Sequence, residues 1–152
     1  MNILTEFECN LSELDNLAKK LAYHSNLGDI YLLKGDLGAG KTTFTRFFIN
    51  SLFDKHKVAR PDIINSPSFP IMINYPLIDF EIEHYDLYRL IDKNELFEIG
   101  IFENIKKNIS IIEWPDIILK DFKLKNYFLI ELEIININYR SIKIFHSIKK
   151  EF

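Results

Sequence analysis

Gly35-Asp-Leu-Gly-Ala-Gly-Lys-Thr42 is the stretch of sequence that decides the fold. It fits the pattern G-x-x-x-x-G-K-[ST], in which a glycine-rich loop holds the phosphates of a nucleotide. The apolar segment Ile30–Lys34 precedes the loop and predicts a buried strand, and Lys41–Phe53 follows it with helical spacing of its apolar residues. A strand, a glycine-rich loop and a helix in this order predict a nucleotide-binding domain of the α/β class.

The residue types in the loop fit phosphate chemistry. Glycine at three positions permits φ > 0 and keeps side chains away from a phosphate, so that successive N–H groups can face inward at the positive end of a helix. Lys41 supplies an ammonium group for the β- and γ-phosphates, the Thr42 hydroxyl ligates Mg²⁺, and Thr43 adds a hydrogen bond to the α-phosphate. The predicted nucleotide-binding residues are Gly35, Asp36, Leu37, Gly38, Ala39, Gly40, Lys41, Thr42 and Thr43.

Two acidic residues are candidates for the remaining chemistry. Glu113 follows the apolar strand Ile109–Ile112, the place from which P-loop proteins supply a second acidic group to the metal or to the attacking water. The alternative is a solvated carboxylate at a strand end. Asp86 lies where an extended segment gives way to a helical pattern, so it is either a helix N-cap or a catalytic acid. His84, two residues earlier on the same sheet face, is predicted to be a structural histidine.

The rest of the chain predicts a mixed central sheet flanked by helices, closed by a C-terminal β-hairpin. Its 152 residues fit one P-loop NTPase-like domain over positions 1–152. The predicted elements are a strand at Ile3–Glu8, a helix at Glu13–Tyr23 capped by Asn10 or Ser12, antiparallel strands at Phe69–Tyr75 and Ile78–Tyr85, helical pieces over Leu87–Ile105 interrupted at Gly100, and a hairpin of Tyr127–Ile137 with Ser141–Ile148.

Composition excludes several classes of protein. Hydrophobic content of 47% and charged content of 27% are near the globular average and exclude an intrinsically disordered chain. The net charge of −3 argues against a stand-alone DNA- or RNA-binding protein. The single cysteine, Cys9, predicts a small buried side chain in a reducing compartment. Without a signal peptide or an apolar run of about 20 residues, the expected location is the cytoplasm, with no membrane association.

Several segments together resemble the TsaE family, the ATPase of bacterial tRNA threonylcarbamoyladenosine (t6A) biosynthesis. They occur in the family's order over about residues 1–118. The matching segments are Gly35–Phe44, Ser66–Phe69, His84–Leu90, Glu98–Gly100 and Ile112–Pro115. Two positions depart from the family pattern: Ser68 stands where threonine is usual, and Phe47 where glycine is frequent. The serine keeps the hydroxyl, and the phenylalanine changes packing rather than phosphate chemistry.

The resemblance implies an activity and partners. A TsaE-like chain binds ATP and Mg²⁺ and hydrolyses ATP slowly. The threonylcarbamoyl transfer itself belongs to a TsaD-like protein paired with a TsaB-like protein, on which the TsaE-like chain docks, so that tRNA is reached only through that complex. By the same resemblance Lys41 binds phosphate, Thr42 and Glu113 ligate Mg²⁺, and Asp86 is an acid needed for hydrolysis. Ser66–Ser68 corresponds to a switch segment, and Trp114 and Arg140 correspond to residues near the nucleotide.

Two other functions use the same loop. A small-molecule kinase would need an arginine-rich lid, whereas this chain has only Arg46, Arg60, Arg89 and Arg140. A non-hydrolysing, nucleotide-gated binding module would release no phosphate. Measuring ATP turnover with and without candidate partners separates these two functions from an ATPase.

Overall fold

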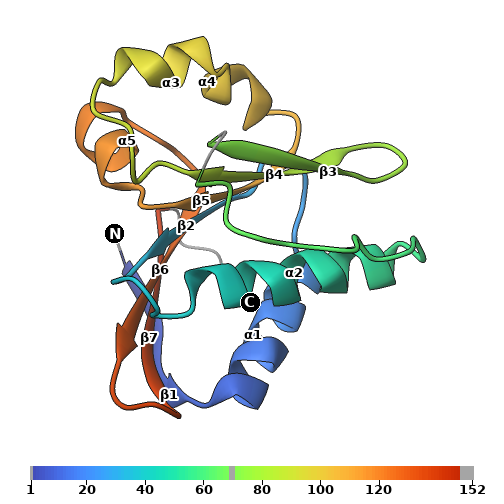
Figure 1. Ribbon diagram of the computed structural model, residues 1–152, viewed down its shortest axis with the longest axis vertical. Helices are drawn as coiled ribbons and strands as arrows, with labels where there is room; N and C mark the ends of the chain where they lie inside the picture. The colour runs from blue at the N-terminus through green and yellow to red at the C-terminus, as the bar shows by residue number, and fades with distance from the viewer. Residues whose placement is uncertain (1, 69–70, 148–152) are drawn as a thin grey trace.

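A computed structural model describes residues 2–68 and 71–147, and within them one mixed sheet has helices on both faces (Figure 1). Its strands are β1 (Asn2–Cys9), β2 (Ile30–Lys34), β3 (Met72–Pro76), β4 (Glu81–Asp86), β5 (Ile109–Glu113), β6 (Tyr127–Ile134) and β7 (Arg140–His146). They lie in the order β1-β7-β6-β2-β5-β4-β3. The central strands β6, β2, β5 and β4 are parallel, whereas β3, β7 and β1 pair antiparallel. The predicted α/β fold with a C-terminal hairpin is confirmed.

The helices divide between the two faces of the sheet. In Figure 1, α1 (Leu11–Tyr23) and α2 (Lys41–Lys55) lie on one face, while α3 (Asn94–Glu98), α4 (Ile101–Asn104) and α5 (Asp116–Asp121) lie on the other. Strand β2 serves both faces: Tyr31 and Leu33 pack in the core of α1 and α2, and Leu32 packs in the core of the short helices. A continuous apolar run is what a central parallel strand covered on both faces requires. None of the described helices is long and apolar enough to cross a membrane.

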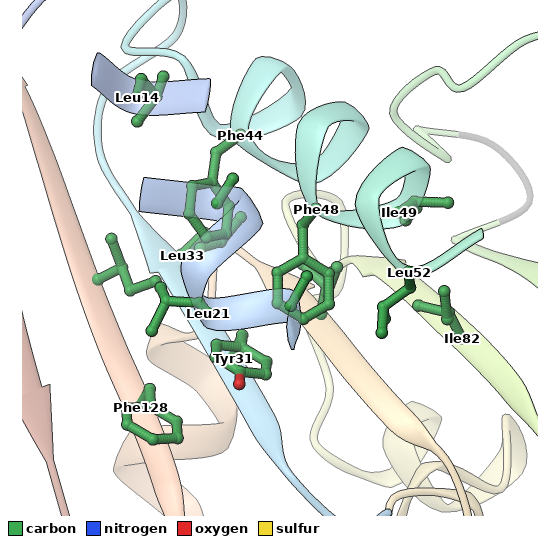
Figure 2. Close-up of a cluster of buried hydrophobic side chains, with 14 of the residues drawn as sticks. Leu14, Leu21, Tyr31, Leu33, Phe44, Phe48, Ile49, Leu52, Ile82 and Phe128 are labelled. Carbon is green, nitrogen blue, oxygen red and sulfur yellow. The ribbon is translucent and has the colours of Figure 1, made fainter. Parts of the chain in front are cut away.

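Aromatic side chains fix α2 against the sheet. Figure 2 shows Phe44 and Phe48 of α2 above Tyr31 of β2, with Phe128 of β6 beside it. The ring centroids of Tyr31 and Phe48 are 4.7 Å apart, and Tyr31 stacks on Phe128 at 5.1 Å with 7° between the planes. Such pairs add about 0.5–1.5 kcal/mol each beyond the burial of their area. The glycine-rich loop therefore connects two elements that are rigidly packed.

Several element boundaries differ from the predictions. β3 and β4 both begin later than expected. Ile71, just before β3, has φ of 84° and is not extended, and the Leu77 N–H donates to the Phe80 carbonyl, so that the turn after β3 delays the start of β4. Residues 87–93 are not helical, and α3 begins only at Asn94, whereas Gly100 interrupts the helical pieces as predicted, with φ of 69°. The six residues of α5 are too few to show a helical period in the sequence. Phe69 and Ile148, predicted to lie in strands, are outside the described residues.

Asn10 caps α1, which begins two residues earlier than the sequence predicted. Its side-chain oxygen accepts the Glu13 N–H at 2.9 Å, and the Glu13 carboxylate accepts the Asn10 N–H at 3.5 Å. We expect Asn10→Ala to lower the free energy of unfolding by about 1 kcal/mol, because the Glu13 N–H at the helix start loses its side-chain acceptor. Urea unfolding would measure the loss. Asn16→Ala, on the exposed side of α1, is the control and should not destabilise the protein; equal stabilities for the two variants would contradict the capping role.

Candidate functional site

The glycine-rich loop runs from the end of β2 to the start of α2. Gly38 and Gly40 have φ of 78° and 111°, which L side chains rarely adopt. Gly40 is the N-cap of α2 and provides no side-chain hydrogen bond, so the first N–H groups of α2 have no capping side chain. Uncapped N–H groups at the positive end of a 15-residue helix are suited to bind an anion.

Gly35 is required for a different reason, which is close packing against β6. A Cβ atom at this position would collide with the backbone oxygen of Leu132, whereas at Gly38 it would meet nothing within 4 Å. We expect Gly35→Ala to push the loop away from β6 and to cost about 1–3 kcal/mol of stability. Gly38→Ala meets only the cost of a positive φ, about 1–2 kcal/mol. Thermal unfolding and the crystal structure of Gly35→Ala would check this; an undisplaced loop would contradict it.

The predicted acidic residues meet at the carboxyl ends of two neighbouring parallel strands. Asp86 ends β4 and Glu113 ends β5, and the two are partners in the strand register. The Ser66 hydroxyl lies 2.6 Å from Asp86 Oδ2 and 3.0 Å from Glu113 Oε2. The Thr42 hydroxyl donates to Glu113 Oε1 at 3.1 Å. Thus residues far apart in the sequence form one cluster of oxygen atoms at the start of α2.

The alternative interpretations of the two acids are wrong. Asp86 is not a helix N-cap, because the next helix after it begins only at Asn94; its Oδ1 accepts the Tyr88 N–H at 3.0 Å in a tight turn. Glu113 is not a solvated carboxylate, because it is only 1% exposed. Burial by itself raises the pKa of Glu113, but His84 and the hydroxyl groups of Ser66 and Thr42 outweigh it and hold this pKa below its ordinary value.

His84 belongs to the same cluster. It is fully buried, and its Nε2 lies 3.6 Å from Glu113 Oε1. It comes from β4, two residues before Asp86, as the alternation of the strand predicts. The structure therefore places a nitrogen beside the carboxylate that also contacts Thr42, so His84 supports Glu113 from the buried side.

Lys41 is turned back onto its own loop. Its Nζ donates to the carbonyls of Gly35 and Asp36, the latter at 2.9 Å, and lies 4.1 Å from the centre of the Trp114 ring. Burial lowers the pKa of Lys41, and the carboxylates of Glu113, Asp86 and Asp36 oppose this effect. Trp114 has φ of 56° and packs on Tyr88, with ring centroids 4.7 Å apart. The aromatic residue expected near the nucleotide thus lies against the lysine that is predicted to bind phosphate.

A cavity of about 380 Å³ contains most of the predicted site. Both acids, the switch-segment serines and the aromatic pair line it. Its full lining is Leu37, Gly38, Gly40, Lys41, Thr42, Thr43, Ser66, Ser68, Asp86, Tyr88, Arg89, Glu113 and Trp114. Of the predicted nucleotide-binding residues, three do not line this cavity: Gly35 lies against β6, Asp36 is exposed, and Ala39 is buried under the loop.

A second cavity, of about 560 Å³, lies beside the same loop. Gly38, Gly40 and Thr43 line both cavities, so the two are contiguous along the loop. Ala39 of the loop also lines the second cavity, and the residues that complete it come from the end of β1, the start of α1 and the tip of the β6–β7 hairpin: Cys9, Asn10, Leu11, Ser12, Leu14, Ile137, Asn138, Tyr139 and Arg140. Sequence reasoning missed this cavity, because no motif marks segments that only tertiary folding brings together. Cys9 is buried there, as predicted.

The donor set fits a hard cation that is held together with phosphate. Carboxylate and hydroxyl oxygens from Glu113 and Thr42 are the ligand type that Mg²⁺ prefers. Among residues 2–68 and 71–147, no three His, Cys, Asp or Glu side chains are placed to hold a metal ion by themselves. A cation at this cluster would therefore need oxygen ligands from a bound phosphate, as in other P-loop sites.

The sequence of the chain matches one protein family. The sequence model of threonylcarbamoyl adenosine biosynthesis protein TsaE matches residues 9–142. The tRNA threonylcarbamoyladenosine biosynthesis protein TsaE of Rickettsia typhi is 39% identical over 139 residues, which cover 91% of this chain and 90% of the relative. The protein of the same name from Bacillus subtilis is 36% identical over 110 residues, covering 72% of this chain and 65% of the relative.

A solved structure agrees on the architecture. The crystal structure of YdiB from Bacillus subtilis superposes with a TM-score of 0.70 over 97% of this chain and 88% of the other, at 23% identity. At that identity the likeness establishes the shared fold.

Proposed function

The chain belongs to the TsaE family of t6A biosynthesis, and from this premise we propose that it is the Mg²⁺-dependent ATPase of that modification. One observation carries the proposal. Lys41 and Thr42 of the glycine-rich loop line a single cavity with Glu113 and Asp86 from the ends of β5 and β4. A phosphate-binding loop facing two buried carboxylates is the arrangement that nucleotide hydrolysis needs, because the charges that must be neutralised and the water that must be oriented are at the same place.

The residues then have distinct roles. The loop N–H groups and the Lys41 ammonium bind the β- and γ-phosphates, for which Lys41 leaves the carbonyls of Gly35 and Asp36. Thr42 and Glu113 hold Mg²⁺, which neutralises phosphate charge when bound. Asp86 orients a water molecule that attacks the γ-phosphorus in line, while the bond to the β–γ bridging oxygen breaks. The second cavity, contiguous along the loop, would take the nucleoside end of ATP.

We further propose that turnover depends on docking to a TsaD-like and TsaB-like pair. The loop contains no arginine, and Arg89, exposed at the cavity, makes no hydrogen bond or ion pair with Asp86 or Glu113. Without an arginine on the transferring phosphate, intrinsic hydrolysis is expected to be slow. Leu37 and Tyr88 line the cavity yet are 73% and 59% exposed, which is suited to a protein partner that covers the opening.

ATP turnover and partner capture test the proposal together. Phosphate release would be measured for the chain alone and with the TsaD-like and TsaB-like proteins, and pull-downs would compare ATP with ADP. Binding can be followed through Trp114, the single tryptophan, since its ring lies beside Lys41. We expect phosphate release that rises with the partners. Label transferred to a third molecule would indicate a kinase, and binding without phosphate release a nucleotide-gated module. No heat with millimolar Mg-ATP in calorimetry would overturn the proposal.

A further inference from the structure

Arg140, the first residue of β7, is hydrogen-bonded to two separate segments of backbone. Its Nε donates to the carbonyl of Ala39 at 3.0 Å and its Nη2 to that of Gly38 at 3.2 Å. Its Nη1 donates to the carbonyls of Asn136 and Tyr139, at 2.7 and 3.0 Å. One guanidinium group therefore ties the phosphate-binding loop to the hairpin tip, about 100 residues away in the sequence.

These contacts fix the direction of two successive peptide groups in the loop. In a trans peptide the C=O and the following N–H point in opposite directions. Holding the carbonyls of Gly38 and Ala39 on Arg140 therefore turns the N–H groups of Ala39 and Gly40 away from the guanidinium. The Ala39 N–H donates to the Asp36 carbonyl at 3.0 Å and closes the turn of the loop. Of these two N–H groups, that of Gly40 therefore remains for a ligand at the start of α2.

The loop benefits from such a hold, because the hydrogen bond of the Ala39 N–H does not by itself fix the peptide planes beside the two glycines. Gly38 and Gly40 stand on either side of Ala39, and glycine leaves the adjoining peptide planes free to rotate. A rotated plane would present a carbonyl oxygen, rather than an N–H, to a phosphate. The planar guanidinium matches two neighbouring carbonyls at once, which a lysine ammonium, a point charge on a flexible stem, does not do.

We propose that Arg140 is a positioning residue that sets the phosphate-binding loop in its binding conformation by holding the carbonyls of Gly38 and Ala39. The inference rests on the proposed ATP binding, and it differs from a direct contact of Arg140 with the nucleotide. The same guanidinium group also holds the hairpin tip, so one side chain links the tip to the loop. Displacing the tip therefore changes the loop.

Hydrogen exchange in the nucleotide-free protein is the first test, using Arg140→Lys and Arg140→Ala. We expect the amides of residues 35–41 to exchange about 10-fold faster in both variants, because each loses the paired carbonyl contacts. Amides of β6 should keep their wild-type rate in Arg140→Lys. Arg60→Lys is the matched control, since Arg60 pairs with Asp54 on the surface, and it should leave the loop unchanged. Wild-type exchange of residues 35–41 in Arg140→Lys would overturn the inference.

Nucleotide affinity is the second test, and it separates positioning from a direct contact of Arg140 with the γ-phosphate. A misplaced loop weakens binding of ADP and ATP by the same factor, about 10-fold, because the loop N–H groups serve both nucleotides. A loss confined to ATP, with affinity retained in Arg140→Lys, would mean that Arg140 touches the γ-phosphate and would also overturn the inference. If the wild-type chain binds neither nucleotide, the proposed function fails, while the exchange comparison still decides the role of Arg140.

Discussion

Lys41→Ala is expected to weaken ATP binding by about 100-fold or more. The substitution removes the ammonium group that is proposed to contact the phosphates, and losing one partner of a buried charge pair has an effect of this size. The side chain is only 6% exposed and is the one ammonium among the residues that line the cavity with Glu113 and Asp86. Without it, the phosphate charge would face two carboxylates. Isothermal calorimetry with Mg-ATP measures the loss directly, which matters because the Trp114 signal itself depends on Lys41.

Two further variants are controls for folding and for net charge in the Lys41→Ala experiment. Lys41→Met keeps the apolar stem against Trp114, so it should fold like the wild type and still fail to bind. Lys34→Ala removes the same charge next to the loop, but Lys34 is exposed, pairs with Asp116 and does not line the 380 Å³ cavity. Its affinity should stay near that of the wild type. If Lys34→Ala and Lys41→Ala lost affinity equally, net charge rather than the loop contact would be responsible.

Asp86→Asn is expected to lower the rate of ATP hydrolysis by about 100-fold or more while ATP affinity changes by less than about threefold. Asparagine keeps the shape of the side chain and an oxygen for the Tyr88 N–H, but it lacks the charge that orients the attacking water. Phosphate release should be measured both for the chain alone and in the complex with its partners, and binding by the emission of Trp114.

The control for Asp86 is Asp79→Asn, an exposed aspartate in the turn between β3 and β4. It removes the same charge and should hydrolyse ATP at the wild-type rate. Hydrolysis at the wild-type rate by Asp86→Asn in the assembled complex would show that Asp86 does not orient the water, and would leave Glu113 for that role.

The centre of the fold was predictable from the sequence, and its edges were less so. Strand β2 has the predicted bounds, Ile30–Lys34, because a strand buried on both faces leaves an uninterrupted apolar run next to the glycines. The hairpin β6–β7 was also predicted, but its attachment was not. No local pattern in Tyr127–Ile134 shows that β6 pairs parallel with β2, since alternation specifies a face and not a neighbour. β7 begins at Arg140, one residue before the predicted start at Ser141.

The same distinction applies to the site. The residues of the loop form a contiguous motif, and Glu113 follows directly from the end of a buried strand, so both could be found along the chain. The hydroxyl contact of Ser66 with both carboxylates depends on a segment without regular structure, and nothing in Ser-Pro-Ser distinguishes it from an ordinary turn. The hydrogen bonds from Arg140 to the carbonyls of Gly38 and Ala39 depend on a pairing between distant strands, which the sequence alone does not reveal.

The order of the strands has a consequence for biosynthesis. β1 pairs with β7, and one edge of β2 pairs with β6. The first two strands in the sequence therefore pair with the last two, which are synthesised at the end of translation. A nascent chain that ends before Tyr127 lacks strand β6, against which Gly35 packs, and it lacks Arg140, which donates hydrogen bonds to the loop. Such distant pairings form late. A ligand of the glycine-rich loop can therefore stabilise the fold only after most of the chain has been synthesised, and until then the edge of β2 that pairs with β6 stays unpaired.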